Sequence, residues 1–396
     1  MNKVDKILDQ FTDPLTGSVH GAVFIAIDSS GNVLYRRAAG KANLDDERAP
    51  ALQIDSLYWI ASMTKLVTAV AVMQLVERGI VSLEDDVRAI VPELRDIQIL
   101  EDMRNGVSLM CHTAGFVYDS SSPLLQQWSK SQGRTAYTFC GSMAGYHHPL
   151  LFEPDTSWGY GAGLDWAGRV MECVTNSTLE DYMRTHIWSK LGVVSTTFHP
   201  ELYRETLPPQ MGMGYRVSVG QGVKSLKSGP VILKQPAQHD LGGIGLFSTP
   251  MDFVKLLSAL LGGGHPLLTR ESVDILLQPQ LNDASREAMP RPLGAQMRRV
   301  LAIQDVGDTQ QADHSLAGTI VLKDIAGRRR AGTVNWSGLP NLHWWIDRQT
   351  GIAATLFTQV MPPGDAAATS LLINLEESLY AALDEGAARM DVSVKL

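Results

Sequence analysis

The sequence has 396 residues, of which 44% are hydrophobic and 19% are charged, a balance typical of a folded globular protein with a sizeable core. The formal net charge is −8, which argues against binding to a nucleic-acid backbone, since proteins that do so carry clustered Lys and Arg. The three cysteines, Cys111, Cys140 and Cys173, are too few and too scattered for a disulfide framework or a paired-cysteine metal site. We therefore expect a reducing compartment and no metal site.

Targeting and cofactor signals are also missing from the sequence. The first six residues alternate charged and apolar side chains and lack the apolar core of a signal peptide, and no apolar run reaches membrane-spanning length. There is no His-Glu-x-x-His zinc motif and no glycine-rich phosphate loop after a strand. These features predict a cytoplasmic protein that uses no cofactor and binds neither membranes nor nucleic acid.

The first predicted elements are a short amphipathic helix and a β-hairpin. The helix covers residues 3 to 12, and the two strands cover 20 to 28 and 33 to 39. They are joined by the turn-forming sequence Ser29-Ser30-Gly31-Asn32.

The next stretch, Trp59-Ile60-Ala61-Ser62-Met63-Thr64-Lys65, precedes a run of apolar residues at helical spacing from 66 to 77, and Gly79 follows as a stop. Ser62 and Lys65 are therefore predicted to lie one turn apart at the start of a buried helix, where their side chains can touch. A serine becomes a nucleophile when a neighbouring group removes its proton, and a neutral lysine can do so. The alternative is a helix-capping serine beside an unrelated lysine.

The middle of the chain is predicted to consist of helices and irregular segments. Ser82-Leu83-Glu84-Asp85-Asp86 suits a helix start, and Pro92 is expected to end that helix. Residues 105 to 160 are rich in proline and aromatic residues, which either line a pocket or belong to the core. Further helices are expected over 164 to 174, 179 to 191 and 253 to 261, with loops and short strands over 200 to 245 and a loop over 280 to 312.

The C-terminal region has the alternation of strands, followed by a closing helix over 367 to 383. The strands are expected over 315 to 322, 332 to 336, 342 to 346 and 352 to 358. Because strands occur at both ends of the chain, we expect an α/β fold with one antiparallel sheet built from both termini, flanking helices and a helical middle.

Two further expectations concern the organisation of the chain. The sheet region should comprise 1–60 and 300–396, and the mostly helical region 61–299 should carry Ser62, all within one domain. The basic run Arg328-Arg329-Arg330 lies between glycines and is predicted to be a solvated hairpin tip.

Three motifs occur in order: Ser62-Met63-Thr64-Lys65, Trp158-Gly159-Tyr160-Gly161-Ala162-Gly163-Leu164-Asp165, and Trp336-Ser337-Gly338. In that order and at those separations they resemble the motifs of the serine β-lactamase and penicillin-binding superfamily. Within it the chain is most similar to the class C-like family VIII carboxylesterases, and among these to fungal acyltransferases and hydrolases of statin-type polyketides. The resemblance extends from about residue 18 to residue 383 and implies a class C β-lactamase-like fold.

The resemblance also implies roles for individual residues. Ser62 would be the nucleophile, Lys65 its partner and Tyr160 the second base, which passes protons to and from the leaving oxygen. The oxyanion hole would consist of the backbone N–H groups of Ser62 and Leu339, the latter following Gly338 on a sheet-edge strand.

One histidine and one shortened segment complete the comparison with the family pattern. By the resemblance, His112 has a structural role rather than that of a base. The segment around it, from 107 to 115, is about three residues shorter than in the family.

Two departures from the β-lactamase motifs bear on the substrate. Trp336 replaces the lysine that helps to hold an antibiotic's carboxylate, and Ala162 replaces the asparagine that contacts the β-lactam side chain. Antibiotic hydrolysis is therefore disfavoured, and an ester or thioester with an apolar body is favoured. The expected substrate-binding residues are Tyr118, Trp128, Tyr146, Trp336 and Gly338, although Tyr118 is almost equally well explained as a core aromatic residue.

The sequence thus favours a serine esterase or acyltransferase that forms an acyl-enzyme, acting on a polyketide-like secondary metabolite. The expected partners are an acyl ester or thioester, an alcohol acceptor and a carrier protein that serves as acyl donor. The alternative is a catalytically idle relative that binds a ligand or partner, because one fold can serve several functions. The residues do not decide between hydrolysis and acyl transfer, since both use the same acyl-enzyme.

Overall fold

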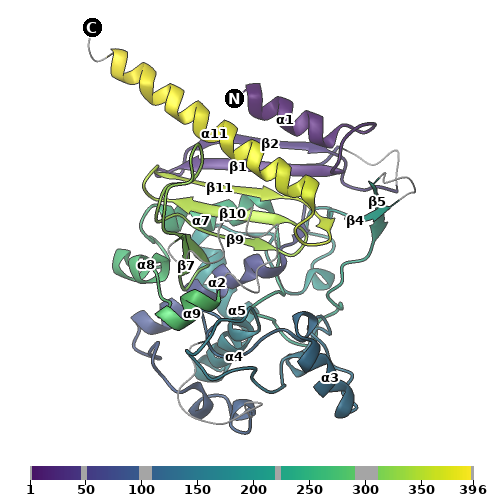
Figure 1. Cartoon of the computed structure of the whole chain (residues 1–396), viewed down its shortest axis with the longest axis vertical. Helices are drawn as coiled ribbons and strands as arrows, with labels where there is room; N and C mark the ends of the chain where they lie inside the picture. The colour runs from purple at the N-terminus through teal and green to yellow at the C-terminus, as the bar shows by residue number, and fades with distance from the viewer. Residues whose placement is uncertain (1, 46–50, 98–108, 219–223, 290–310, 394–396) are drawn as a thin grey trace.

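The computed structural model describes residues 2–45, 51–97, 109–218, 224–289 and 311–393, with side chains described up to residue 385. At its centre is a seven-stranded sheet with the strand order β2-β1-β11-β10-β9-β8-β7 (Figure 1). Its strands are β1 (Gly21–Asp28), β2 (Val33–Gly40), β7 (Ala312–His314), β8 (Thr319–Val321), β9 (Val334–Gly338), β10 (Leu342–Asp347) and β11 (Ile352–Phe357). Every neighbouring pair in this sheet is antiparallel.

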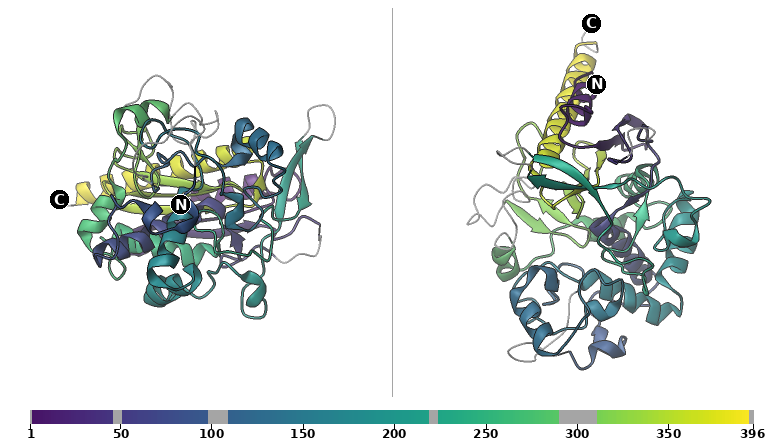
Figure 2. Two further views of the ribbon diagram at one scale, coloured as in Figure 1. Left: turned by 90° about the horizontal axis from the view of Figure 1, so that it is seen from below. Right: turned by 90° about the vertical axis from the view of Figure 1, so that its right-hand side faces the viewer.

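The sheet is assembled from the two ends of the chain, as the sequence predicts. The N-terminal hairpin β1–β2 joins the C-terminal strands through β11, in a register that pairs Ile25 with Thr355. Both termini consequently lie at the same end of the molecule, beyond the β1–β2 edge of the sheet (Figures 1 and 2). The predicted α/β fold class is confirmed, whereas the residue bounds proposed for its two regions stay a prediction.

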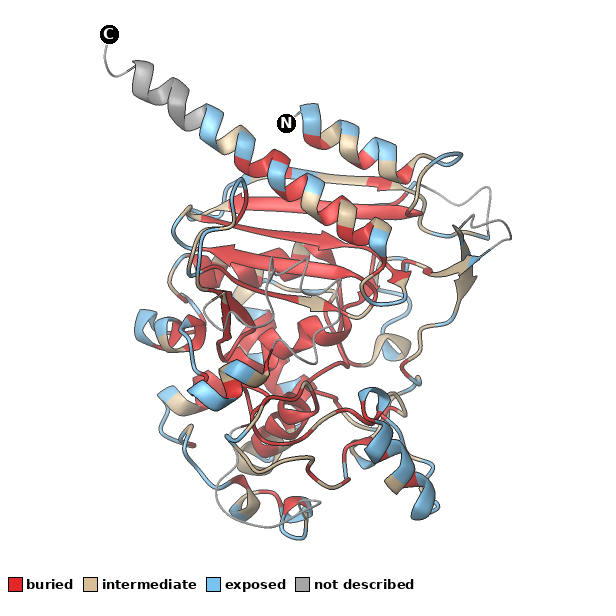
Figure 3. Cartoon of the chain, viewed as in Figure 1, coloured by how far each residue is buried: buried red, intermediate tan, exposed pale blue. Residues whose placement is uncertain are grey.

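The two faces of the sheet bury different sets of side chains because successive residues of a strand point to opposite sides. Phe24 of β1 packs with the helices α1 (Asn2–Thr12) and α11 (Ala366–Ser393) on the outer face. Ile25 packs into the larger core that includes α2 (Thr64–Glu77) and α7 (Pro250–Leu261) on the inner face. Figure 3 shows the central strands buried between these layers, with the outward side of α11 exposed.

The region between the two sheet-forming ends is mainly helical. Its helices are α3 (Pro123–Ser131), α4 (Gly163–Thr175), α5 (Leu179–Met183), α6 (Ser189–Leu191), α8 (Arg270–Leu277) and α9 (Asp283–Ala288), with a π-helical turn η6 (Arg184–Trp188) between α5 and α6. Single 3₁₀ turns are η1 (Ala61–Met63), η2 (Val87–Ala89), η3 (Pro92–Leu94), η4 (Asp119–Ser121), η5 (Met143–Gly145) and η7 (Pro200–Leu202). Threonines cap two of these helices, since the side chains of Thr178 and Thr249 accept hydrogen bonds from the first turns of α5 and α7.

Short strands complete the fold. β4 (Met213–Ser218) and β5 (Lys224–Gly229) form a hairpin that is extended by β12 (Val360–Met361), and β3 (Tyr58–Trp59) pairs with β6 (Phe247–Ser248). The prediction of short strands over 200 to 245 is therefore confirmed. Among the described residues, no helix is both long enough and apolar enough to cross a membrane.

The structure corrects two predicted elements. The expected helix after Ser82 is absent, and η2 and η3 stand in its place, with Pro92 as the first residue of η3 rather than the end of a helix. Residues 280 to 312 are not all loop, because Asn282 caps the short helix α9. The rest of that predicted loop, residues 290–310, lies outside the described residues, as do Val107 and Ser108 of the shortened segment.

The prediction that Arg328-Arg329-Arg330 forms a solvated hairpin tip is wrong. Arg328 and Arg329 are 6% and 1% exposed, and both form ion pairs with Glu376 of α11 at 2.8 Å. Only Arg330 is substantially exposed. The error arose because the carboxylate that makes burial of these cations tolerable comes from a distant part of the chain.

Candidate active site

Ser62 lies in the tight turn η1, which leads directly into α2 at the centre of the molecule (Figure 1). The preceding residue, Ala61, has a φ of +45°, a conformation that residues other than glycine seldom adopt. Such strain persists where surrounding contacts hold it, and here Thr64 Oγ1 donates to the Ala61 carbonyl at 2.6 Å. The Ile60 amide also donates to the Leu246 carbonyl at 3.0 Å. The nucleophile turn is thus anchored on both sides.

The helix that follows is buried on all sides, with every residue from Thr64 to Leu75 buried. A helix of this kind belongs to the core rather than the surface. Its first turn places Lys65 inside the protein, where the side chain is 3% exposed. Ser62 is 7% exposed. The structure therefore brings both predicted residues to one buried site.

Tyr160 reaches this site from the loop before α4, and its hydroxyl donates to Ser62 Oγ at 2.6 Å. Lys65 Nζ lies 4.8 Å from the centre of the Tyr160 ring. Gly161 is required for this approach, because a Cβ there would lie 1.5 Å from the Phe116 carbonyl oxygen. The three residues that the motifs single out are therefore adjacent in space.

Lys65 donates two hydrogen bonds, to Tyr118 Oη at 3.0 Å and to the Gly243 carbonyl at 2.9 Å. Tyr118 in turn donates to Asp165 Oδ2 at 2.8 Å, and the Gly243 amide donates to Asp165 Oδ1 at the same distance. Lys65, Tyr118 and Asp165 thus form a buried hydrogen-bonded chain. Gly243 has no space for a side chain, since a Cβ would lie 2.3 Å from Asp165 Oδ2.

Burial sets the protonation of this chain. It raises the pKa of Asp165 above its ordinary value, while the charge of Lys65 acts in the opposite direction. Burial and the neighbouring Asp165 hold the pKa of Tyr118 well above its ordinary value. Tyr118 therefore keeps its proton and can accept from Lys65 while it donates to Asp165.

The neutral His112 lies beside Tyr160, and the neutral His314 lies beside His112. The His112 ring is 4.7 Å from the Tyr160 ring and 5.2 Å from the His314 ring. Burial lowers the pKa of His112 well below its usual range, and burial lowers that of His314 to about 4. His112 Nδ1 accepts from the Gly161 amide at 3.3 Å, a position that fits the structural role predicted for it.

The third motif lies next to the nucleophile turn. Trp336 in β9 has its ring 5.3 Å from that of Tyr160, and a Cβ at Gly338 would lie 2.5 Å from the Ile60 carbonyl oxygen. β9 is an inner strand of the sheet, but β8 pairs with it only as far as Asn335. The end of β9 that carries Trp336 to Gly338 therefore lies past this pairing, and it leads to the half-buried Leu339.

The structure does not form the aromatic wall that the sequence suggests. Trp128 lies on α3, at the periphery of the molecule (Figure 1), where its ring is 5.7 Å from the Arg134 guanidinium carbon. Tyr146 is fully buried and donates to the Thr138 carbonyl at 3.1 Å, and its ring lies 5.7 Å from that of Tyr118. Tyr118 is 4% exposed and bonded to Lys65 and Asp165, so it belongs to the buried chain rather than to a pocket wall.

Sequence reasoning missed Asp165, Gly243 and His314 as parts of the site. Asp165 lies inside the second motif, five residues after Tyr160, and that position was the available signal. Gly243 and His314 carry no local signal, because their partners Asp165 and His112 are far away in the sequence.

Comparison with known proteins agrees with this geometry. The family model described as Beta-lactamase matches residues 4–377. The lovastatin esterase of Penicillium rubens is 31% identical over 382 residues, which cover 88% of this chain and 91% of that protein. The monacolin J acid methylbutanoyltransferase of Aspergillus terreus is 29% identical over 395 residues and 93% of each chain. The LovD6 mutant of simvastatin synthase from Aspergillus terreus has a TM-score of 0.84 at 27% identity, covering 96% of this chain and 95% of that one.

The fold is that of a serine hydrolase or acyltransferase with a β-lactamase-like architecture. The chain belongs to the β-lactamase family. Within that family it is similar to esterases and acyltransferases, which confirms the predicted enzyme class.

Proposed function

We propose that Ser62, Lys65 and Tyr160 catalyse acyl transfer from an ester or thioester through an acyl-enzyme. The observation that carries this proposal is the 2.6 Å hydrogen bond between Tyr160 Oη and Ser62 Oγ, beside the buried Lys65. A nucleophile, a base in contact with it and a third group beside the base are the parts that covalent catalysis requires.

The proposed reaction has two steps with a defined path for each proton. In the reacting state Lys65 is uncharged, so that the Tyr160–Lys65 pair can take up a proton. Ser62 Oγ attacks the acyl carbon and its proton passes to this pair, which then protonates the leaving oxygen or sulfur as its bond to the acyl carbon breaks. In the second step water or an alcohol gives its proton to the same pair and attacks the acyl-enzyme. Ser62 Oγ recovers that proton when the ester bond to the enzyme breaks.

The backbone amides of Ser62 and Leu339 are proposed as the oxyanion hole. The close approach of Gly338 to the Ile60 carbonyl supports this assignment, because it brings the end of β9 against the nucleophile turn. Amide donors that are fixed in place before the reaction stabilise the charge that develops on the acyl oxygen.

The proposed substrate has an apolar acyl group and a polyketide-like alcohol. Trp336 rather than a lysine lies beside Tyr160, so this position offers no cation to a substrate carboxylate. Relatives named for lovastatin and for monacolin J acid support an alcohol of that kind. A thioester on a carrier protein fits as acyl donor, and the three free cysteines fit a reducing compartment such as the cytoplasm.

The test is intact-mass measurement after brief exposure to p-nitrophenyl butyrate and to a butyryl thioester. We expect the mass to increase by one acyl group in the wild type and in Ser189→Ala, a control that alters an exposed helix serine. Ser62→Ala should gain no acyl group. An adduct of equal yield on Ser62→Ala would refute the assignment of the nucleophile.

The same experiment addresses the remaining alternatives. Adding a polyketide alcohol to the preformed acyl-enzyme separates transfer, which yields a new ester, from hydrolysis, which yields the free acid. An idle binding protein would show neither an adduct on Ser62 nor turnover of any acyl donor in the panel.

A further inference from the structure

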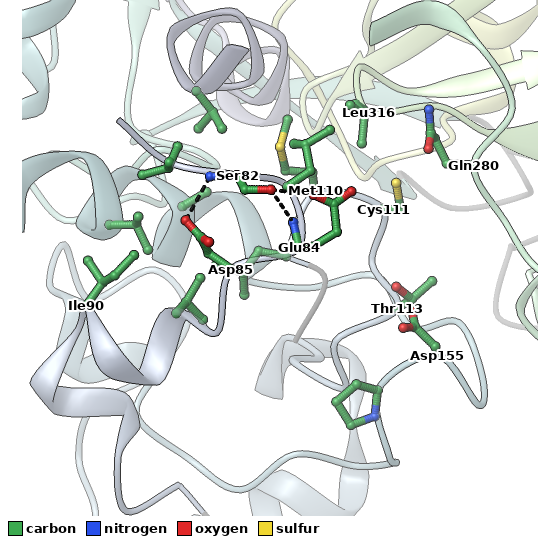
Figure 4. A pocket seen from close by; sticks show the side chains of 18 of the residues that line it. Ser82, Glu84, Asp85, Ile90, Met110, Cys111, Thr113, Asp155, Gln280 and Leu316 are labelled. Atoms are coloured by element: carbon green, nitrogen blue, oxygen red, sulfur yellow. Dashed lines mark hydrogen bonds between the residues drawn. The ribbon is translucent and has the colours of Figure 1, made fainter. Parts of the chain in front are cut away.

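A cavity of about 630 Å³ lies away from the nucleophile, between the segments 81–90 and 109–113, with α2 and α4 contributing to its walls (Figure 4). Its volume is within the range of small-molecule sites in proteins. The described residues that line it do not include Ser62, Lys65 or Tyr160. It is therefore distinct from the proposed catalytic site.

The inner part of this cavity is apolar and its mouth is acidic. The buried apolar side chains that line it include Val72 of α2, Ala167 and Val170 of α4, Met110 and Leu316. Exposed carboxylates at the mouth come from Glu84, Asp85 and Asp155.

Among the residues that the structure describes, none in the cavity carries a charge opposite to these three carboxylates. Glu84 and Asp85 bond the hydroxyl and amide of Ser82, as Figure 4 shows, but neither they nor Asp155 form an ion pair with another described residue. No lysine, arginine or histidine is among the described residues that line the cavity. The mouth therefore favours a cation, and the interior favours an apolar group.

The wall beside His112 is uncharged. Thr113 lines the cavity and is 4% exposed, and its hydroxyl has no hydrogen-bond partner among the described residues. The hydroxyl oxygen has almost no solvent-accessible surface, so Thr113 contributes no polar contact to the cavity. The neighbouring Cys111 thiol also lines the cavity, and burial raises its pKa so that it stays uncharged.

The cavity shares its wall with the surroundings of Tyr160. Cys111 and Thr113 flank His112, which has a φ of +62° and lies with its ring 4.7 Å from that of Tyr160. Leu316, which also lines the cavity, follows His314 by two residues. A ligand in the cavity would thus contact Cys111 and Thr113, the immediate neighbours of His112, which borders Tyr160.

We propose that this cavity is an effector site for a small amphiphilic cation, such as an amine with an apolar body. Its occupant would hold segment 109–113 against Tyr160 and so change the rate of acyl transfer at Ser62. The binding part of the proposal is independent of the proposed function, and the effect on rate depends on it.

Binding is tested by calorimetry on the Ser62→Ala protein, which separates it from turnover. Hexylammonium should bind about tenfold more tightly than hexanoate or hexanol, which share its apolar body. The variant with Glu84→Gln, Asp85→Asn and Asp155→Asn should lose this preference, since it changes only exposed side chains and Asn tolerates the positive φ of Asp155. Asp283→Asn, an exposed carboxylate that does not line the cavity, is the matched control.

Filling the cavity provides a second test. Ala167→Phe should abolish binding of hexylammonium, while circular dichroism and the melting temperature report whether this variant is folded. Equal binding of hexanoate and hexylammonium, or unchanged binding in the triple carboxylate variant, would overturn the proposal.

The effect of cavity binding on the rate of acyl transfer is tested on the wild-type protein with p-nitrophenyl butyrate as substrate. Saturating hexylammonium should change kcat/KM by about fivefold. The half-maximal change should occur at the dissociation constant that calorimetry gives. The triple carboxylate variant should show no effect. An equal effect on that variant would place the cation at the Ser62 site and overturn the effector role. Absence of all turnover would refute the proposed function while leaving the binding result intact.

Discussion

At the scale of the residue, the site depends on a tyrosine that does not touch the nucleophile. Tyr118 accepts from Lys65 and donates to Asp165, so one hydroxyl connects an amine with a carboxyl group inside the core. Buried charges are tolerated when they are paired and hydrogen-bonded, and this connection meets that condition. Lys65 is consequently held at a fixed place beside the Tyr160 ring.

Replacing Tyr118 by Phe should lower kcat for p-nitrophenyl butyrate by about 10- to 100-fold, because Lys65 and Asp165 lose the hydroxyl that positions them. Tyr146→Phe is the matched control, since this tyrosine is also buried and its hydroxyl bonds only the Thr138 carbonyl. It should retain activity and lose about 1 kcal/mol of stability. Steady-state kinetics and denaturant unfolding of both variants measure these effects on kcat and on stability. Equal losses of kcat in the two variants would show that Tyr118 acts only through packing.

The sequence could predict that Ser62, Lys65 and Tyr160 belong to one site because each lies in a short motif that occurs in a fixed order, and the structure places them together. It could not assign Tyr118, since nothing local distinguishes a tyrosine in a charge chain from a core aromatic residue. The same ambiguity applies to the prediction for Trp128. Aromatic residues are equally common in pocket walls and cores, and the helix that carries Trp128 lies at the periphery of the molecule.

At the scale of the element, the loop that precedes β6 holds the site together. Its Gly243 bonds Lys65 through the carbonyl and Asp165 through the amide, so two distant elements meet at one residue without a side chain. A Cβ at position 243 would lie 2.3 Å from Asp165 Oδ2 and 2.8 Å from Tyr118 Oη. Asp165 and Tyr118 therefore leave no room for a side chain at position 243.

We expect Gly243→Ala to lower both stability, by about 1 to 3 kcal/mol, and activity, because the new methyl group must displace Asp165 or Tyr118. Gly262→Ala serves as control, since a Cβ there meets nothing closer than 3.2 Å. Thermal unfolding and kcat/KM should separate the two variants. Wild-type activity in Gly243→Ala would mean that the Lys65 chain tolerates displacement.

The same loop is joined to the start of η7 through His199, whose Nε2 lies 2.7 Å from Asp240 Oδ1 and whose Nδ1 lies 3.4 Å from Glu201. The hydrogen bond to Asp240 raises the pKa of His199 to about 9, against the desolvation that opposes it, and Glu201 and Glu180 add to the effect. A pKa above that of the unfolded chain means that this stabilisation is fully present below about pH 6.5 and disappears as the pH rises through about 9.

The wild type should therefore lose about 1 to 2 kcal/mol of stability between pH 6.5 and pH 9, with partial exposure of His199 taken into account. His199→Gln should show a smaller change over this range, because the group that titrates is gone. Urea unfolding at several pH values measures both proteins. Parallel stability profiles for the two would contradict a protonated His199 in the folded state.

At the scale of the whole molecule, the N-terminal hairpin and the C-terminal strands form one sheet above the catalytic helix. This arrangement could be predicted from the sequence because hairpins, alternating strands and helix caps are local patterns. The pairing of Arg328 and Arg329 with Glu376 could not, because a basic run is exposed in most proteins and its partner here lies on α11. Long-range charge pairing was the missing information at this scale, as it was for Asp165 in the site.

The Arg328–Arg329–Glu376 cluster lies on the sheet face opposite α2, so its loss should affect folding and not chemistry (Figure 1). Burial lowers the pKa of Arg329, and Glu376, which is fully buried, opposes this shift. Glu376→Gln would leave the buried Arg329 guanidinium beside a neutral amide, and we expect it to cost about 3 to 5 kcal/mol of stability. Glu377→Gln, at the exposed neighbouring position, should cost less than about 0.5 kcal/mol.

Denaturant unfolding measures both variants, and kcat/KM per folded molecule should stay at the wild-type value. Similar stabilities for the two variants would mean that the arginines find water or another acceptor, and that this cluster does not hold α11 on the sheet.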